Sequence, residues 1–362
     1  MSKPMRIGIV GSGIFGQFHL KAFTQVQNEG KAELVAIADL VKEKRDKAAD
    51  EYNVTPYEDY REMIEKEKLD AISVVTPDFY HGDIAVTGLE MGCHVLCEKP
   101  MATTMDDCRK IMAASEKNPD KLFMVDYHKR YDIYHIELER MIREGKLGNI
   151  QYGYAYMEDR IEVSRDWFKN WPAGSSPFWF IGTHFVDLIY WVVKSKGAKV
   201  FATGRKEKLK SYGLDFWDNI SAQIIFENGA TFTVDAGWTL PEGFEAIVNQ
   251  AIRIVGTEGI FEIDSQDRGA GACLKGETQK SYNLGVYAEK HRPDGSIEYG
   301  GYGIESIMEF GYHVHYLLNG GDIKNLEGMY ANAQDGFEVA KICLAAHVSA
   351  EQGGVVVDLN TL

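Results

Sequence analysis

The chain has 362 residues, of which 45% are hydrophobic and 26% charged, and its formal net charge is −15. At about 150 residues a domain, this length predicts two domains, and the composition excludes a disordered chain, a collagen-like chain and a small disulfide scaffold. An acidic chain repels phosphate backbones, so no nucleic-acid partner is expected.

The sequence gives no sign of a membrane segment, of export or of a metal. No apolar run approaches the ~20 residues that span a bilayer, and the first residues carry no signal-peptide pattern. The five cysteines are odd in number and lack paired spacing, which indicates reduced thiols in a cytoplasmic protein. Neither Cys93 with Cys97 nor His313 with His315 has a partner set at metal-ligand spacing, so no metal is predicted.

From residue 6 to about 126, short β-branched apolar runs alternate with amphipathic helical stretches. The predicted strands are 6–10, 33–38, 71–75, 94–97 and 122–125, and the predicted helices between them are 15–28, 42–51, 58–67, 80–91 and 104–117. Uninterrupted apolar strands separated by helices predict a parallel sheet that is covered on both faces. This is the doubly wound α/β arrangement of a Rossmann domain.

The rest of the chain shows the alternating pattern of antiparallel strands. Residues 220–226 and 232–236 alternate on either side of Asn228-Gly229, a strong two-residue hairpin signal, and 250–256 with 259–264 form a second expected hairpin. Helices are predicted at 132–145, 178–193, 304–318 and 329–350. We therefore expect an α+β domain with a large, mostly antiparallel open sheet, and we place the domain boundary between residues 126 and 127.

A glycine-rich turn follows the first predicted strand directly and opens the first predicted helix. Its pattern is G-x-G-x-x-G, in which Gly11, Gly13 and Gly16 frame Ile14 and Phe15. Glycines permit a tight turn and let backbone N–H groups approach a pyrophosphate at a helix N-terminus. In this context the motif favours a dinucleotide site over a nucleotide-free turn.

An acidic residue stands where a dinucleotide site needs one. Asp39 ends the second predicted strand, 23 residues after Gly16, near the ~20 expected for the acid that binds the adenosine ribose hydroxyls. Its carboxylate would repel a 2′-phosphate, and no arginine follows directly, so NAD is predicted over NADP. The alternative role for Asp39 is to cap the helix expected from residue 42.

Polar residues also follow the next two predicted strands, at the edge where parallel sheets bind ligands. These candidate contacts are Thr76, Pro77 and His81 after one strand, and Glu98 and Lys99, followed by Pro100, after the next. Proline restricts the residue before it, so the Lys99 ammonium is aimed, and near a nicotinamide it can polarise a carbonyl or lower the pKa of an alcohol. The alternative roles are structural. Thr76 and Pro77 could simply start a helix, His81 could be a buried histidine in its first turn, and Lys99 could be a solvated charge on a loop.

Together these motifs make the sequence resemble the Gfo/Idh/MocA family, named for glucose–fructose oxidoreductase, inositol dehydrogenase and rhizopine catabolism. The matching residues span nearly the whole chain in order: Gly11–Gly16, Asp39, Val75–Pro77 with His81, Glu98–Pro100, Arg130-Tyr131, Gly182–His184 with Asp187, and Gly256–Gly259. The resemblance implies an NAD-binding domain, 1–126, and a substrate-binding and oligomerisation domain, 127–362. It also implies homodimers or homotetramers that associate through the open sheet face.

The resemblance implies that Lys99 and His184 flank the reacting hydroxyl. An imidazole has an unperturbed pKa near ~6.5 and can accept an alcohol proton at neutral pH, so His184 is the expected general base. Lys99 would then orient the substrate and stabilise the alkoxide, although the reverse assignment is open. On pattern alone, His184 also suits a core position on an apolar helix.

The sequence departs from the family pattern one helical turn before this histidine. Many members have an aspartate there, whereas this chain has Phe180. The missing carboxylate could come from Asp187 on the same helix face, or from Asp159 or Glu158 at the end of an aromatic strand.

Aromatic and charged residues further along supply candidate substrate contacts. Aromatic faces suit the C–H faces of sugar rings, and flanking charges suit hydroxyls. The candidates are Tyr156, Asp159, Arg160, Trp179, Phe180, Asp187 and, at the domain junction, His128, with Arg130 assigned to the cofactor. An aromatic wall favours a large ligand such as a glycoside with its aglycone. The alternatives are a Tyr- and Trp-packed sheet core and a charged hinge.

The leading function is therefore an NAD-dependent oxidoreductase that transfers a hydride between the nicotinamide and a secondary hydroxyl or keto group of a sugar, cyclitol or glycoside. One alternative is a glycoside-cleaving enzyme that uses bound NAD for transient oxidation. Another is a catalytically silent NAD-binding regulator, against which the retained Lys99 and His184 argue.

Overall fold

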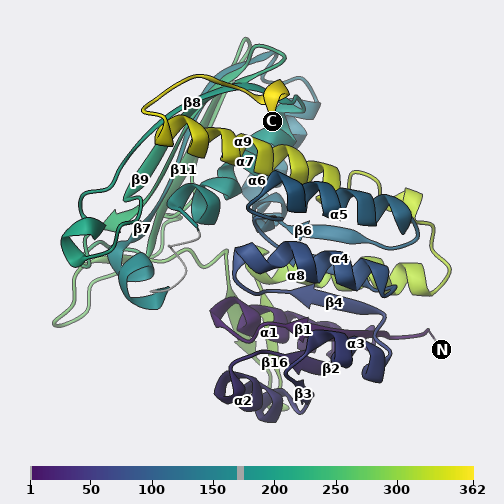
Figure 1. The fold of residues 1–362 in the computed structure, drawn as a ribbon. Coiled ribbons are helices and arrows are strands. Elements are labelled where there is room, and N and C mark those ends of the chain that lie inside the picture. The colour runs from purple at the N-terminus through teal and green to yellow at the C-terminus, as the bar shows by residue number, and fades with distance from the viewer. Residues whose placement is uncertain (1, 169–174) are drawn as a thin grey trace. The chain divides into compact units, whose positions relative to one another are not determined.

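The computed structural model describes residues 2–168 and 175–362 (Figure 1). The chain forms two compact units, each with contributions from two stretches of sequence. Unit 1 consists of Met1–Tyr131 with Val286–Phe337, and unit 2 of Asp132–Gly285 with Glu338–Leu362. The first crossing between the units, after Tyr131, lies close to the boundary placed at 126/127. The return of residues 286–337 to unit 1 differs from the contiguous division expected from the sequence.

Unit 1 is built on a six-stranded parallel sheet with the order β3-β2-β1-β4-β5-β6. Its strands are β1 (Met5–Val10), β2 (Ala32–Ala38), β3 (Thr55–Tyr57), β4 (Ala71–Val74), β5 (His94–Glu98) and β6 (Phe123–Asp126). The predicted Rossmann sheet is confirmed. The edge strand β3 was not predicted, because three residues are too few to show a period.

Helices cover both faces of this sheet, as a doubly wound fold requires. Right-handed crossovers place α1 and α2 on one face and α3, α4 and α5 on the other. The helices are α1 (Ile14–Asn28), α2 (Lys42–Tyr52), α3 (Tyr60–Glu67), α4 (His81–Glu90) and α5 (Met105–Lys117), with short helical turns η1 (Asp78–Tyr80) and η2 (His128–Tyr131). Side chains cap two of them: Asp59 accepts from Arg61 N, and Thr104 accepts from Asp107 N.

The later segment of unit 1 adds a helix beside α1. In α8 (Tyr302–Leu318), Phe310 packs edge-on against Phe23 of α1, with ring centroids 6.4 Å apart. Gly311 lets the two helices approach, because a Cβ there would lie 3.2 Å from Val26. The segment also contains β15 (Ala288–His291), β16 (Ile297–Gly300) and η6 (Ile323–Leu326). Its return to unit 1 therefore follows from the apolar face of α8, which is buried in the core beside α1.

Unit 2 contains a seven-stranded sheet with the order β12-β11-β7-β10-β9-β8-β17. Its strands are β7 (Ile150–Arg160), β8 (Gly197–Arg205), β9 (Asn219–Phe226), β10 (Thr231–Leu240), β11 (Val248–Gly256), β12 (Ile260–Asp264) and β17 (Val357–Asp358). Only the β7–β10 pair is parallel among these neighbours, which confirms the mostly antiparallel sheet. A separate small sheet pairs β13 (Gly271–Ala272) with β14 (Lys280–Ser281).

Both predicted hairpins of unit 2 are present, and one face of the sheet is buried. Gly229 adopts φ 88° in the turn between β9 and β10, and the alternate residues Ile220, Ala222 and Ile224 are fully buried. The helices and helical turns of this unit are α6 (Ile133–Arg143), η3 (Val163–Trp167), η4 (Phe178–Gly182), α7 (Thr183–Val193), η5 (Leu209–Tyr212), most of α9 (Ala333–Glu351) and η7 (Leu359–Thr361). On the opposite face Tyr152, Tyr154, Phe201 and Ile225 are exposed; we call this the open face.

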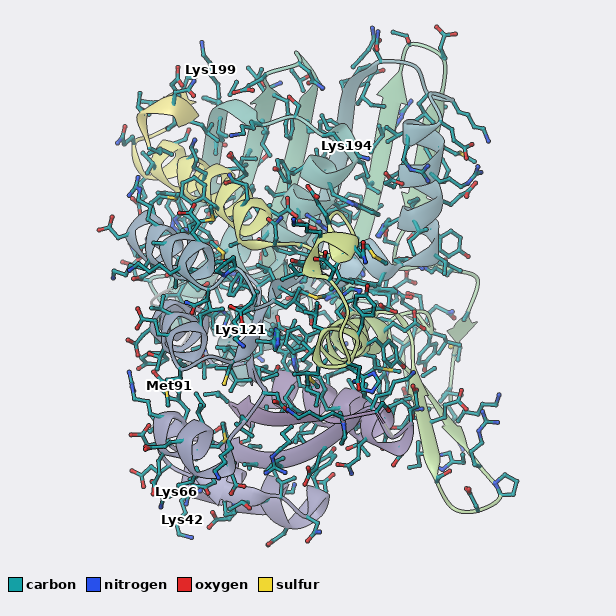
Figure 2. The ribbon with its side chains drawn as sticks, turned by 90° about the vertical axis from the view of Figure 1, so that its right-hand side faces the viewer. Lys42, Lys66, Met91, Lys121, Lys194 and Lys199 are labelled. Atoms are coloured by element: carbon teal, nitrogen blue, oxygen red, sulfur yellow. The ribbon has the colours of Figure 1, made fainter. Side chains whose placement is uncertain are left out.

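Charged side chains cover much of the surface (Figure 2). Lys42 of α2 and Lys66 of α3 project outward, and each pairs with an acidic residue four positions away on its own helix, Asp46 and Glu62 respectively. No helix among the described residues is both long enough and apolar enough to cross a membrane.

Candidate functional site

The glycine-rich turn of unit 1 has the geometry that close approach of a ligand requires. Gly11 adopts φ +110°, and a Cβ there would lie 2.5 Å from the carbonyl oxygen of Val75. A Cβ on Gly16 would lie 2.5 Å from Gly11 O, so both positions demand glycine. Gly13 caps α1 without a side-chain hydrogen bond, and a Cβ there would meet none of the described atoms within 4 Å. The open N-terminus of α1 thus fits a pyrophosphate.

Asp39 ties the end of β2 to this turn. Its Oδ2 accepts hydrogen bonds from Ser12 N (2.8 Å) and Ser12 Oγ (2.6 Å), and its Oδ1 accepts from Val41 N (2.8 Å). Val41 is the N-cap residue of α2, so Asp39 shapes the turn before that helix without being its cap. Nearby, Arg45 donates to Asp39 O at 3.4 Å and pairs with Asp46 at 3.0 Å.

His81 connects the two loops that follow β4 and β5. Its Nδ1 lies 2.8 Å from Pro100 O and its Nε2 lies 2.9 Å from Thr76 O, and the ring is buried. Each nitrogen thus lies at hydrogen-bond distance from a backbone carbonyl, and the nitrogen that carries the proton donates to its carbonyl. The ring holds these loops together. The assignments of His81, Thr76, Pro77 and Glu98 to cofactor binding stay predictions.

The E-K-P loop is also held from its own strand. Glu98 Oε2 accepts a hydrogen bond from Lys99 N at 3.0 Å. Lys99 is only 6% exposed, and its Nζ lies 5.5 Å from the ring centroid of Phe15, in the first turn of α1. The lysine is thus a fixed cation beside the glycine-rich turn and not a solvated loop charge.

A buried polar cluster below this lysine was missed by sequence reasoning. His19 of α1 is fully buried, with its Nδ1 2.7 Å from Ser73 Oγ of β4 and its Nε2 3.1 Å from Glu98 Oε1. The same Nε2 lies 4.0 Å from Oδ2 of Asp126, the last residue of β6. The one sequence signal was a histidine on the apolar side of the helix, three residues after Gly16.

The pKa values of the two carboxyl groups in this cluster are shifted in opposite directions. Burial alone would raise the pKa of Glu98, but the hydrogen bond and charge of His19, together with the charge of Lys99, lower it. Burial, reinforced by the charge of Glu98, raises the pKa of Asp126 to about 7. Two carboxylates cannot both ionise cheaply in a buried site, so Glu98 carries the negative charge, and Asp126 keeps its proton below about pH 7 and loses it above.

The donor atoms of His19, Glu98 and Asp126 lie within 4.8 Å of one another, a spacing that a metal site also shows. Both nitrogens of His19, however, already face protein partners, Ser73 and Glu98. His19 therefore takes part in hydrogen bonds on both of its nitrogens, while Asp126, at 4.0 Å from its Nε2, lies outside hydrogen-bond distance of the ring.

The residues at the end of β6 contact other parts of unit 1. Arg130 is buried and forms an ion pair with Asp335 at 3.2 Å, and His128 stacks on Tyr302 with ring centroids 5.5 Å apart. These contacts anchor η2 to α8 and to the start of α9. The assignments of Arg130 to the cofactor and of His128 to the substrate stay predictions.

In unit 2, His184 lies in the first turn of α7 and is 3% exposed, with Asp187 fully buried on the same helix. Phe180 packs against Phe168 and Trp238, at centroid distances of 5.3 and 6.2 Å. An apolar ring in an aromatic cluster cannot do the work of the aspartate that the family resemblance leads us to expect at this position.

The alternation of β7 separates the other candidates in unit 2. Asp159 lies on the buried face of the strand, whereas Tyr156 and Arg160 lie on the open-face side. Trp179 is buried and stacks on His347 at 5.9 Å. Lys99 belongs to unit 1 and His184 to unit 2.

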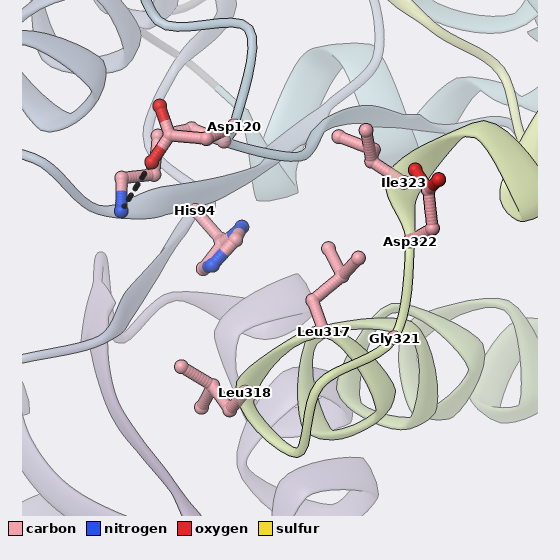
Figure 3. A pocket seen from close by; sticks show the side chains of 8 residues that line it. His94, Asp120, Leu317, Leu318, Gly321, Asp322 and Ile323 are labelled. Atoms are coloured by element: carbon pink, nitrogen blue, oxygen red, sulfur yellow. Dashed lines mark ion pairs between the residues drawn. The ribbon is translucent and has the colours of Figure 1, made fainter.

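A separate cavity lies at the amino end of β5, at the opposite edge of the unit 1 sheet (Figure 3). It is lined by His94, Asp120, Lys121, Leu317, Leu318, Gly321, Asp322 and Ile323. Burial, reinforced by the charge of Lys121, lowers the pKa of His94 to about 4, and its Nδ1 accepts a hydrogen bond from Leu122 N at 2.8 Å. None of the predicted site residues lines this cavity.

Comparison with known proteins places the chain in a family. The family model described as "Oxidoreductase family, NAD-binding Rossmann fold" matches residues 5–127, and the "GFO/IDH/MocA C-terminal domain" matches residues 135–262. The chain therefore belongs to the Gfo/Idh/MocA oxidoreductase family, as its motifs predicted.

Its relatives include several named dehydrogenases. A D-glucoside 3-dehydrogenase of Escherichia coli is 28% identical over 264 residues, which cover 68% of this chain and 74% of that protein. An inositol 2-dehydrogenase of Salmonella typhimurium is 27% identical over 205 residues, 54% of this chain. The chain spans 57% of the length of that inositol 2-dehydrogenase.

Solved structures share the fold over the whole chain. A scyllo-inositol dehydrogenase from Lactobacillus casei with bound NAD(H) and scyllo-inositol has a TM-score of 0.77 at 22% identity, covering 99% of this chain and 100% of that one. A myo-inositol 2-dehydrogenase from Lactobacillus plantarum also has a TM-score of 0.77 at 22% identity, covering 98% and 99%.

The raised pKa of Asp126 predicts a specific pH dependence of stability. Between its ordinary value, 3.8, and about 7, the folded state holds a proton that the unfolded state has lost. The contribution of this group to the free energy of unfolding therefore falls by about 1.4 kcal/mol for each pH unit in that window. We expect Asp126→Asn, which cannot ionise, to gain stability relative to the parent as the pH rises from 4.5 to 7.5 in urea titrations. A difference between the two proteins that is constant with pH would contradict the assignment.

Proposed function

We propose that the protein is an NAD-dependent oxidoreductase that moves a hydride between the nicotinamide and a secondary hydroxyl or keto group of a sugar, cyclitol or glycoside. The observation that carries this proposal is the edge of the unit 1 sheet. There the uncapped N-terminus of α1, the Asp39 carboxylate and the buried Lys99 ammonium follow the ends of three strands. The inositol and glucoside dehydrogenases among the relatives support the substrate class.

In this proposal the chain supplies binding, orientation and proton transfer. NAD, when bound, supplies the hydride acceptor. The E-K-P loop fixes Lys99, whose ammonium orients the reacting hydroxyl and stabilises negative charge that develops on its oxygen. His184 accepts the hydroxyl proton as general base. Asp187, three residues later on α7, is our choice for the carboxylate that supports His184, because Phe180 cannot do so.

The substrate contacts proposed in unit 2 fall into two groups. Asp159 and Asp187 are buried, on β7 and α7, and suit hydroxyl recognition beside His184. Trp179 and Phe180 shape the start of α7 by packing, and Tyr156 and Arg160 face the open side of the sheet. Because these side chains pack internally or face the open side of the sheet, they give less support to a substrate with a large aglycone than the sequence analysis expected.

We further propose that copies of the chain associate through the open face, where the exposed Tyr152, Tyr154, Phe201 and Ile225 would be covered. Cytoplasmic location is proposed from the cysteines, all five of which are free thiols and four of which are buried.

NAD is proposed over NADP because the Asp39 carboxylate, fixed by Ser12, occupies the end of β2 where the adenosine ribose binds. We expect Asp39→Ala to weaken NAD binding about tenfold and to relax discrimination against NADP, as measured by calorimetry with each nucleotide. Ser12→Ala is the matched control, because it loosens the turn but keeps the charge, and it should retain the preference for NAD. Equal relaxation in both variants would refute the assignment to the ribose.

The proposed reaction is tested by an absorbance screen for NADH formation across sugars, cyclitols and aryl glycosides. We expect NADH to accumulate with at least one substrate, and Lys99→Ala to lower turnover by at least ~10²-fold with NAD binding largely intact. Lys66→Ala removes an exposed lysine of α3 and should behave as the parent (Figure 2).

The outcomes of this screen separate the alternatives. Cleavage of a glycoside with catalytic NAD and no NADH accumulation would favour the glycoside-cleaving reaction. Tight NAD binding with no turnover on any substrate would favour the regulator. Unchanged turnover in Lys99→Ala would remove the proposed mechanism.

A further inference from the structure

The buried cluster around His19 brings two carboxyl groups together at one strand edge. β5 and β6 are parallel neighbours, and their register pairs Glu98 directly with Asp126. Both side chains turn toward the same imidazole, at 3.1 Å and 4.0 Å from its Nε2. Asp126 is 2% exposed, and its Oδ1 has no hydrogen-bond partner among the described residues.

The hydrogen bonds of the cluster decide where a negative charge is stable. One oxygen of Glu98 is hydrogen-bonded to the imidazole of His19, and the other accepts a hydrogen bond from the backbone N–H of Lys99. Asp126 has neither of these donors, and its ionised form is supported only by the Ser306 hydroxyl and by the more distant charges of His19 and Lys99. One negative charge on Glu98 is thus well supported, and a second on Asp126 is poorly supported, so the pair retains one proton.

The groups that face this pair come from each element packed around it. They are His19 from α1, Lys99 from the E-K-P loop, His128 from η2 and, from α8, the uncharged hydroxyl of Ser306. A further positive charge placed at this edge would therefore act on a carboxyl group that is close to ionising.

A bound dinucleotide would bring such a charge. The glycine-rich turn follows β1 and the ribose acid follows β2, so the adenosine half lies on the β2 side of the sheet. The other half must then extend over β4, β5 and β6, toward Glu98 and Asp126. Its nicotinamide ring is positively charged when oxidised and neutral when reduced.

We propose that Asp126 is a redox-linked positioning residue, ionised while the oxidised nicotinamide is bound and protonated while the reduced ring is bound. This inference rests on the proposed function for its ligand. Oxidation of the alcohol gives the ring a hydride, with two electrons, and releases one proton. The hydroxyl proton passes to His184, and the Asp126–Glu98 pair is separately more protonated, by uptake from solvent, in the complex with reduced cofactor than in the complex with oxidised cofactor. The cluster thereby favours NAD⁺ over NADH increasingly as the pH rises.

The expected effect is measurable in binding, without any turnover. A shift of one unit in a pKa corresponds to a tenfold change in affinity. We therefore expect the ratio of the dissociation constants of NAD⁺ and NADH to fall about tenfold between pH 5.5 and pH 8.5. Calorimetry in two buffers of different ionisation enthalpy should show proton release on NAD⁺ binding near pH 7, and none on NADH binding.

Three variants isolate the group responsible. Asp126→Asn should make the ratio independent of pH and abolish the proton release. Glu98→Gln removes the neighbouring charge, so it should move the transition to lower pH. Asp120→Asn removes an equal charge at the amino-end side of β6, near the cavity of Figure 3, and should keep the parent profile.

Each outcome bears on one claim only. If the parent binds neither nucleotide, the proposed function fails. If it binds both with a ratio that is constant with pH, or if Asp126→Asn retains the parent profile, the inference about Asp126 is overturned. A metal ion that copurifies with the parent and is lost from Asp126→Asn would also overturn it, because the ion would then balance the carboxylates. If Asp126→Asn fails to fold, the direction of the shift in Glu98→Gln decides.

Discussion

Two hydrogen bonds from Ser12 to one oxygen of Asp39 join the turn after β1 to the end of β2. They fix the glycine-rich turn against the sheet and leave the first N–H groups of α1 without a side-chain cap. The N-terminus of α1 attracts an anion such as a pyrophosphate. The Asp39 carboxylate beside it would repel a second anion, such as a 2′-phosphate on the ribose. In the proposed NAD site, the helix N-terminus would hold the pyrophosphate and the Asp39 carboxylate the ribose, and the Ser12–Asp39 hydrogen bonds fix the two relative to each other.

The other end of that edge is held by buried polar groups. His81 bridges the carbonyls of Thr76 and Pro100, and Glu98 accepts the Lys99 N–H. The loop that carries the lysine is thus held by β4 and β5 together, which fixes an ammonium group that would otherwise be mobile. In unit 2 the equivalent rigidity comes from aromatic packing, because Phe180 and Trp238 fix the start of the helix that carries His184.

Local signals in the sequence were sufficient for much of this structure. Short motifs identify the glycine-rich turn, Asp39 and the E-K-P loop. The strands β9 and β10 are identified by apolar residues at every second position, so all of these features were predictable from the sequence. The cluster of His19, Ser73, Glu98 and Asp126 was not, because its members come from four elements and lie on no common motif. For the same reason, the packing of α8 beside α1 was not foreseen, since an amphipathic helix does not specify its partner.

The central claim is that a dinucleotide lies along the carboxyl edge of the unit 1 sheet, from Asp39 to Glu98. Hydrogen exchange measured by mass spectrometry with and without NAD⁺ tests it most directly. We predict slower exchange in the glycine-rich turn and in the E-K-P loop, and unchanged exchange around His94 and Asp120 at the amino edge. Protection at the amino edge alone, or no protection of the turn at saturating NAD⁺, would contradict it.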